Sequence, residues 1–598
     1  MSGLDLGVVG NCIVAALVDE RGTIVWHCHP RIDGDPVFCG LLEPRAGPAE
    51  GRFAIELQGL AATRRRYIDN SAVLETLLLD GQGRGVRITD FAPRFRQYDR
   101  VFRPPMLVRR LEPVGGTPLL TVRLRPLFDY GAAVPQRIPG SNHLRFVAAA
   151  GALRVTTDLP IAMLEREAPF VLMRPAWLVL GPDESFAASL DHTCRDFLER
   201  TLDYWCEWSR YLSVPFEWQE AVIRAAVTLK LCSFEETGAI VAALTTSIPE
   251  APGTARTWDY RYCWLRDAFF VVQALNRLGA TRTMEDYLGW VATVMALEPG
   301  RELAPVYGIV PSEPLPERIV PALAGYRGQG PVRIGNQAAE QRQNDSYGSV
   351  VLAVAQMFYD QRLPRRGDLA LFRTLEGLGE IAARVALEPD AGLWEYRGRR
   401  AVHTHSAAMC WAACHHLGKI ANRLGLPDRA SHWRGEAERI RKAILAEAWR
   451  PDLGSFVATF GGSGLDASLL LLHEIGFLAT DDPRFAGTVE AIGRRLRRNG
   501  HLHRYDEEDD FGLPQTAFNI CTFWYIEALA ALGRREEARA LFEHMLQART
   551  SLGLLSEDTD SRTGEPWGNF PQTYSMVGLI TSAMRLSKSW EEAFWRGS

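Results

Sequence analysis

The sequence predicts a two-domain protein, in which an N-terminal antiparallel β-sandwich is followed by an (α/α)6 barrel. Three observations predict this fold class. The chain has 598 residues, which is more than one core of ordinary size accommodates. Short alternating apolar runs separated by glycine-containing turns fill the first third of the chain. From about residue 216 the apolar period becomes 3.6 residues, with little strand pattern between the helical segments.

The β-sandwich is expected over residues 1–187. Each of the stretches IVAALVDERGTIVWHCHP, VLETLLLDGQGRGVRITDFAP and MLVRRLEPVGGTPLLTVRLRPLF consists of two apolar runs around a turn that contains glycine. Such hairpins are typical of an antiparallel sandwich. Residues 188–215 are rich in Trp, Asp and Glu and are expected to form a helical linker, after which Pro215 opens a different pattern.

The barrel is expected over residues 216–598. Twelve helical segments suggest six antiparallel pairs closed into a ring. An open α-solenoid is the alternative, but the sequence has no repeat of fixed period. The expected segments are 217–236, 265–279, 282–296, 344–361, 368–386, 405–423, 428–449, 466–478, 483–499, 516–532, 534–549 and 572–587.

Composition narrows the class of protein. A formal net charge of −5 offers no basic patch to nucleic acid or to an anionic membrane. No apolar run approaches the roughly 20 residues that span a bilayer, and MSGLDLGVVGNC has no basic region before its apolar residues, as a signal peptide would. We therefore expect a cytoplasmic protein without nucleic-acid or membrane partners. Self-association into a homo-oligomer is left open.

The cysteines do not indicate a metal site or a disulfide scaffold. The ten cysteines are scattered along the chain without dense spacing. One cluster, Cys410, Cys414, His415 and His416, contains metal-ligating residue types, but it lies in the apolar helical stretch SAAMCWAACHHLGKIA and no second cysteine pair follows at finger-like spacing. We interpret it as core, since free cysteine is commonly buried. No metal and no cofactor are expected.

Four unusual loops precede even-numbered helices. TWDYRYCWLRD precedes the second predicted helix, EQRQNDSYG the fourth, AGLWEYRGRRAVHTHS the sixth and LLSEDTDSRTGEPWGNFPQTYS the twelfth. If the helices alternate up and down, all four loops emerge at one end of the ring and can share a pocket. Their mixture of aromatic and charged residues suits a sugar, which offers an apolar face for stacking and a rim of hydroxyls for hydrogen bonds.

Two glutamates in these loops are the candidate catalytic residues. Glycoside hydrolysis usually needs one protonated carboxyl group and one ionised carboxylate. Glu395 is flanked by Trp394 and Tyr396, an apolar setting that is expected to raise its pKa and suit a general acid. Glu557 lies in the polar stretch LLSEDTD, which is expected to keep a general base ionised.

Arg266 and Asp267 open the second predicted helix. As a charged fork they could hold adjacent hydroxyls of a sugar. The alternative is that Asp267 interacts with the dipole at the helix N-terminus.

The motifs WDYRYCWLRDA, GLWE and GLLSED together resemble glycoside hydrolase family 15, the glucoamylase and trehalase-like enzymes. The stretch GNCIVAALVDERGTIVWHCHPRIDGDPVFCGLLEP resembles the β-sandwich domain that precedes the barrel in prokaryotic members, so the resemblance covers nearly the whole chain. It implies an inverting, metal-free exo-hydrolase that releases β-D-glucose from non-reducing ends of α-glucosides.

The resemblance also implies roles for single residues. Glu395 matches the general acid of the family and Glu557 its general base. Arg266 and Asp267 match the pair that holds the non-reducing glucose. The substrate-binding residues expected in the pocket are Tyr260, Trp264, Arg266, Asp267 and Trp394.

Two departures leave the substrate open. Trehalase-like members usually have a lysine after THS, where this chain has Ala407, and often a histidine at the position of Met576. A glucoamylase or α-glucosidase type of activity is the first hypothesis and α,α-trehalase its rival. More distant alternatives are a disaccharide phosphorylase and a noncatalytic sugar-binding regulator. The N-terminal loop PRIDGDPVF is expected to overhang the pocket, although proline and glycine there also suit a tight turn.

Overall fold

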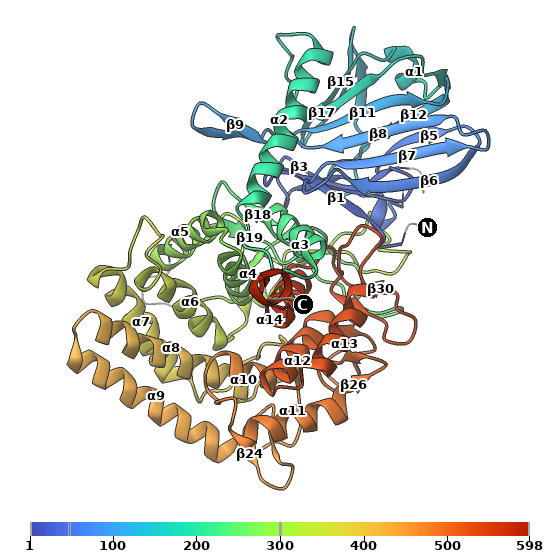
Figure 1. Ribbon diagram of the computed structural model, residues 1–598. Coiled ribbons are helices and arrows are strands. Elements are labelled where there is room, and N and C mark those ends of the chain that lie inside the picture. Colours follow the sequence, from blue (N-terminus) through green and yellow to red (C-terminus); the bar gives the residue numbers. More distant parts are fainter. Residues whose placement is uncertain (1–2, 46, 48–49, 298–301, 596–598) are drawn as a thin grey trace.

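The computed structural model describes residues 3–45, 47, 50–297 and 302–595 (Figure 1). A β-rich N-terminal part, drawn in blue to teal, lies above a ring of helices that runs from green to red. The long helix α2 (Leu190–Arg210) connects the two parts. This arrangement confirms the predicted fold class. The domain boundaries at residues 187 and 215 stay predictions, and both fall just outside α2.

Among the described residues, the N-terminal part contains two large antiparallel sheets and a separate hairpin of β9 (Phe95–Gln97) and β10 (Arg100–Phe102). One has the strand order β1 (Gly7–Gly10), β2 (Ala15–Val18), β3 (Ile24–His29), β5 (Arg52–Leu57), β12 (Leu119–Arg125) and β16 (Phe170–Val171), with β4 (Asp35–Phe38) paired to β3. The other has the order β13 (Gln136–Pro139), β14 (His143–Ala148), β15 (Gly151–Thr157), β17 (Ala176–Gly181), β11 (Leu107–Val114), β8 (Gly85–Phe91), β7 (Leu74–Asp80) and β6 (Leu60–Tyr67).

A buried arginine, paired with an aspartate of its own sheet, joins the two sheets. Arg109 on β11 donates from Nε to Asp90 Oδ1 on β8 at 2.7 Å, and neither side chain is exposed by more than 2%. Arg109 Nη1 also donates to the Phe53 carbonyl on β5, in the other sheet, at 2.9 Å. Because burying charges is costly unless they are paired and hydrogen-bonded, this network fixes how the sheets face each other.

As far as the described residues go, the helical part is a closed ring of six inner helices. They are α4 (Leu265–Arg277), α6 (Asp345–Ala355), α8 (Thr404–Arg423), α10 (Leu471–Glu474) with the preceding 3-10 turn η4 (Ala467–Leu470), α12 (Asn519–Ala531) and α14 (Thr573–Leu586). Each contacts the next, and α14 contacts α4, so the ring closes and the open-solenoid alternative is wrong. The outer helices are α3 (Gln219–Leu231), α5 (Thr281–Leu297), α7 (Leu369–Val385), α9 (Pro427–Glu447), α11 (Pro483–Leu496) and α13 (Arg535–Gln547).

The eighth predicted helix, 466–478, is much shorter than expected. Its regular part ends at Glu474, and Gly476 follows with a φ of +76°. Glycine readily adopts this left-handed conformation and ends helices in this way. The apolar pattern continues to Leu478 because the chain after the helix is still buried in the barrel core.

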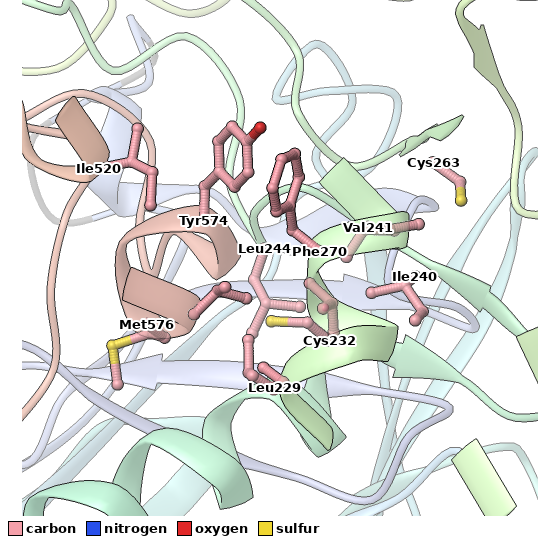
Figure 2. Close-up of a cluster of buried hydrophobic side chains, with 14 of the residues drawn as sticks. Leu229, Cys232, Ile240, Val241, Leu244, Cys263, Phe270, Ile520, Tyr574 and Met576 are labelled. Atoms are coloured by element: carbon pink, nitrogen blue, oxygen red, sulfur yellow. The ribbon is translucent and has the colours of Figure 1, made fainter. Parts of the chain in front are cut away.

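Apolar side chains from several helices fill the ring (Figure 2). Leu229 comes from α3, Phe270 from α4, Ile520 from α12, and Tyr574 and Met576 from α14. The rings of Phe270 and Tyr574 lie beside each other, with centroids 5.2 Å apart. The inner helices are apolar on most of their surface because they contact the outer helices on one side and one another across the ring.

The cysteine cluster of α8 is part of this core. Cys410 and Cys414 are buried, and Cys410 Sγ donates to the Asn344 carbonyl at 3.3 Å. The described residues include no group of three or more metal-ligating side chains arranged to hold an ion. Within the same residues, no helix combines the length and the apolar character needed to cross a bilayer.

Candidate active site

A pocket opens at the end of the ring where α4, α6, α8, α12 and α14 begin. The four loops singled out in the sequence all reach it, which confirms that they emerge at one end. The pocket is also lined by a fifth loop, before α12, which the sequence motifs did not indicate. All seven predicted site residues line the pocket: Tyr260, Trp264, Arg266, Asp267, Trp394, Glu395 and Glu557.

Glu395 lies among nitrogen donors. Its Oε1 accepts hydrogen bonds from Trp264 Nε1 at 2.6 Å, Gln343 Nε2 at 3.2 Å and Arg266 Nη2 at 3.3 Å. The backbone of Glu395 is left-handed, with a φ of +59°. The expected apolar setting is therefore wrong, because residues from two other loops surround the carboxylate.

The sequence neighbours of Glu395 turn to other partners. Trp394 Nε1 donates to Asp466 Oδ2 at 2.9 Å. The Tyr396 ring stacks on His403, with centroids 5.7 Å apart. The left-handed backbone at Glu395 directs the side chains of Trp394, Glu395 and Tyr396 apart. The two aromatic neighbours in the sequence therefore do not form the surroundings of the carboxylate.

Glu557 is buried, with 1% of its surface exposed. Its Oε1 accepts a hydrogen bond from Tyr260 Oη at 2.7 Å, and its Oε2 accepts one from the Asn569 backbone N–H at 3.1 Å. Burial, followed by the negative charges of Asp558 and Glu250, raises the pKa of Glu557 well above its ordinary value, and the two hydrogen bonds oppose this rise. The polar neighbours of Glu557 in the sequence therefore do not keep it ionised, since Asp558 raises its pKa; the groups that favour the ionised form are the donors Tyr260 and Asn569.

A second buried carboxyl group follows immediately. Asp558 Oδ1 accepts a hydrogen bond from Thr516 Oγ1 at 3.1 Å, and burial together with Glu250 raises the pKa of Asp558 to about 8. Glu250 is paired with Arg504, whose Nη2 lies 2.6 Å from Glu250 Oε2. Because like charges at short range cannot all ionise easily, Glu557 and Asp558 retain a proton to higher pH than isolated carboxyl groups do.

Arg266 and Asp267 lie in the first turn of α4, and each is only 7% exposed. Their side chains form an ion pair of 3.4 Å between Arg266 Nε and Asp267 Oδ1. Arg266 Nη1 donates to Gln343 Oε1 at 2.9 Å and lies 3.5 Å from Asp345 Oδ2. Burial is the largest cause that raises the pKa of Asp267, to about 6.

The contact between these two side chains is an ion pair without hydrogen-bond geometry. Within the described residues, Arg266 Nε and Asp267 Oδ1 are buried, face each other and have no hydrogen-bond partner. Both residues also line the pocket, so the hydroxyl groups of a sugar there would meet a charged pair. A helix-dipole role for Asp267 does not require this position.

The N-terminal loop PRIDGDPVF does not overhang the pocket. None of its residues lines the cavity; instead the Gly34 carbonyl accepts a hydrogen bond from Arg261 Nη1 at 2.7 Å. Arg261 Nη2 in turn donates to Asp259 Oδ2 at 2.8 Å, and both side chains are fully buried. The loop therefore supports TWDYRYCWLRD from behind.

The two departures from the family pattern also lie outside the cavity. Ala407 on α8 and Met576 on α14 are fully buried. Neither lines the pocket. Met576 is instead part of the apolar cluster of Figure 2.

Several pocket residues were not selected from the sequence. In EQRQNDSYG, Gln341 lines the pocket, and Gln343 and Asp345 contact Arg266, but nothing in the composition of this loop distinguishes them from their polar neighbours. The stretch DEEDDFGLP, with Asp509 and Phe511, looks like a solvated acidic turn. Arg397 could have been predicted as a pocket residue, because it lies only two residues after Glu395.

The chain is similar to known proteins over most of its length. Residues 218–584 match glycosyl hydrolases family 15, and residues 5–157 match the trehalase-like N-terminal family. A trehalase of Thermoplasma volcanium is 32% identical over 98% of this chain and 93% of its own length. A trehalase of Mycobacterium tuberculosis is 32% identical over 98% of this chain and 90% of its own length.

The fold is similar to that of a solved structure. A bacterial glucoamylase complexed with acarbose superimposes with a TM-score of 0.68. The similarity covers 97% of this chain and 93% of that one, at 15% identity. Because the identity is low, the similarity supports the fold of both domains and carries no conclusion about substrate.

Proposed function

Because this chain belongs to glycosyl hydrolases family 15, we propose that it is an inverting glycoside hydrolase that cleaves α,α-trehalose into two molecules of glucose. The observation that carries the substrate is the similarity to proteins named trehalase, which extends over both domains at 32% identity. The glucoamylase-type hypothesis, placed first from the sequence, is now second, since the likeness to a glucoamylase rests on the fold.

The pocket supplies two carboxyl groups from opposite sides of the ring. Glu395 precedes α8 and Glu557 precedes α14, and these helices are three positions apart in the ring of six. We infer a separation of about 6.5–9.5 Å between the carboxyl groups, which leaves room for a water molecule, as in inverting enzymes. Two carboxyl groups in one pocket are a reason to prefer hydrolysis to phosphorolysis and to noncatalytic binding.

In this mechanism Glu395 donates a proton to the oxygen that joins the two sugars, and the bond from C1 to that oxygen breaks. Glu557 accepts a proton from the water that attacks C1 from the opposite face. Tyr260 donates to Glu557 Oε1 and thereby orients the carboxylate and favours its ionised form. Arg266 and Asp267 hold hydroxyls of the glucose whose C1 is attacked.

The two halves of trehalose should leave as different anomers. Attack by water inverts C1 of the held glucose and gives β-glucose. The other glucose keeps its own C1 configuration and leaves as α-glucose. An inverting trehalase therefore produces the two anomers in equal amounts before mutarotation, whereas a retaining enzyme produces only α-glucose.

The experiment that tests the substrate is a comparison of kcat/KM. The purified chain is assayed with trehalose, maltose, isomaltose, kojibiose, nigerose and soluble starch, without added phosphate. The double variant Glu395→Gln, Glu557→Gln, prepared identically, controls for contaminating glucosidases. We expect trehalose to rank first. Preference for maltose or starch ends would support the glucoamylase type instead, and dependence on phosphate would indicate a phosphorylase.

A further inference from the structure

The loop before α12 forms a tight turn at the mouth of the pocket. Asp509 and Gly512 face each other as a β-bridge, with the Gly512 N–H donating to the Asp509 carbonyl at 3.1 Å. The turn is fixed from outside, since Arg256 Nη1 donates to Asp509 Oδ2 at 2.8 Å. Phe511 lies at its tip, lines the pocket and remains 36% exposed. An apolar ring is thus presented to the cavity by a fixed turn.

A second aromatic ring lies beside Phe511. Trp258 also lines the pocket, and the two rings meet edge to face with centroids 5.1 Å apart. Trp258 Nε1 donates to Glu250 Oε1 at 3.0 Å, which fixes the plane of the indole. Two aromatic surfaces with fixed orientations therefore lie together at the rim.

Arg397 connects this rim to the loop of Glu395. Its guanidinium lies 4.2 Å from the centroid of the Trp258 ring, and its backbone N–H donates to Asp510 Oδ2 at 2.7 Å. Only one residue separates Arg397 from Glu395. Arg397 therefore connects the aromatic rim to the segment of the proposed proton donor by direct contacts.

We infer that Phe511, supported by Trp258 and Arg397, forms the binding surface for the sugar that leaves, and so determines which α-glucosides are cleaved. This inference rests on the proposed function, because it requires a glycosidic bond to be broken beside Glu395. The sugar whose C1 is attacked occupies the deep end, where Arg266 and Asp267 lie. The leaving sugar is bonded to the oxygen that Glu395 protonates, so it lies on the outer side of Glu395.

The chemistry of the rim fits a pyranose ring. The face of a phenyl ring stacks on the C–H face of a sugar, and the carboxylate of Asp510 offers an acceptor for hydroxyls nearby. Phe511 and Trp258 line the pocket next to each other, so they form one continuous aromatic surface. A single sugar ring in the α configuration, as in trehalose, is the leaving group that we assign to this surface.

The test compares a substrate that has a leaving sugar with one that has none. Phe511→Ala, Phe511→Tyr and Leu513→Ala are assayed on trehalose and on α-glucosyl fluoride. Leu513 is the matched control, since it is 50% exposed on the same loop and does not line the pocket. We expect Phe511→Ala to lower kcat/KM on trehalose by about 10-fold or more, the scale for losing one apolar contact with a substrate, and to leave fluoride hydrolysis within about 2-fold. Phe511→Tyr should restore most of the activity, and Leu513→Ala should change neither substrate.

Equal losses on both substrates, or no loss on trehalose, would overturn the inference. Failure of the proposed function can be distinguished from failure of this inference, because it appears in the unmodified protein as a preference for another substrate. In that case the ratio of kcat/KM on the preferred disaccharide to kcat/KM on the fluoride is measured in the same variants. A loss confined to that disaccharide would still support Phe511 as the leaving-sugar surface.

Discussion

Replacing Asp267 by Asn separates a role in holding sugar from a role in holding the fold. Asn has nearly the same shape, so no cavity forms, but the negative charge is lost. Arg266 would not be left unpaired, because it also lies 3.5 Å from Asp345 and 3.3 Å from Glu395. The expected loss is therefore that of a charged hydrogen bond to a sugar hydroxyl, about 1.5–3 kcal/mol. This corresponds to roughly a 10- to 150-fold lower kcat/KM on trehalose.

The stability of the same variant should change in the opposite direction. The pKa of Asp267 is raised from 3.8 to about 6 in the folded chain, mainly by burial. The folded state therefore binds more protons than the unfolded state between these values, and stability is lost as the pH rises through about 6. At pH 7 the ionised carboxylate costs about 3 kcal/mol, at 1.36 kcal/mol per pKa unit. Asp267→Asn removes this cost and should weaken the dependence of stability on pH between 4 and 7.

The assay combines initial rates of glucose release with urea unfolding at pH 4.5 and pH 7. Asp368→Ala is the control, since Asp368 caps α7 by accepting a hydrogen bond from the Leu371 N–H. Loss of a cap costs about 1 kcal/mol of stability and should leave kcat/KM unchanged. If Asp267→Asn behaves like Asp368→Ala, with lower stability and unaffected kinetics, the assignment of Asp267 to sugar binding is wrong.

Four further outcomes are expected. Glu395→Gln should lower activity on trehalose by roughly 10²–10⁴-fold and spare α-glucosyl fluoride, which needs little protonation of its leaving group; equal losses would argue against Glu395 as the acid. Tyr260→Phe removes a donor that favours the ionised form of Glu557. The acidic limb of the pH–kcat/KM profile should therefore move to higher pH by about one unit. An unchanged acidic limb would mean that Glu557 does not control it. Arg261→Met leaves Asp259 buried without its partner and should lower the free energy of unfolding by about 3–5 kcal/mol in urea, whereas an unchanged midpoint would contradict the supporting role of this pair. Proton NMR during the first minutes of α-glucosyl fluoride hydrolysis should show β-glucose, and α-glucose appearing first would indicate a retaining enzyme.

The end of the ring at which the pocket lies was predictable from the sequence, because it follows from the number and order of the helices. Helical periodicity marks twelve segments, and alternation of direction places every loop before an even-numbered helix at one end. The loops that contain Glu395 and Glu557 could therefore be assigned to one pocket from their order in the chain. Ring closure, by the contact of α14 with α3 and α4, depends on tertiary packing.

The surroundings of each carboxyl group could not be predicted from neighbouring letters. Glu395 is flanked by Trp394 and Tyr396, yet its carboxylate contacts Trp264, Arg266 and Gln343, which lie 52 to 131 residues away in sequence. Its left-handed backbone sends the flanking side chains elsewhere.

Glu557 shows the reverse case. It stands in a polar stretch, but that stretch is buried, and its carboxyl group meets Tyr260, 297 residues away in sequence, and the negative charge of Glu250. The loop with Phe511 was missed for a related reason. Its contacts with Arg256 and Arg397 join segments 253 and 113 residues apart.

The left-handed backbone of Glu395 has a consequence for what the carboxylate does in the fold. A residue with a side chain costs about 1–2 kcal/mol in this conformation, whereas glycine adopts it freely. Glu395→Gly would relieve this cost, but it would leave Trp264 Nε1, Gln343 Nε2 and Arg266 Nη2 without the carboxylate to which they donate. Because an unpaired buried donor costs about 1–3 kcal/mol, the substitution should lower the free energy of unfolding as well as abolish turnover. The donors that orient the carboxylate therefore also stabilise the unfavourable backbone that presents it.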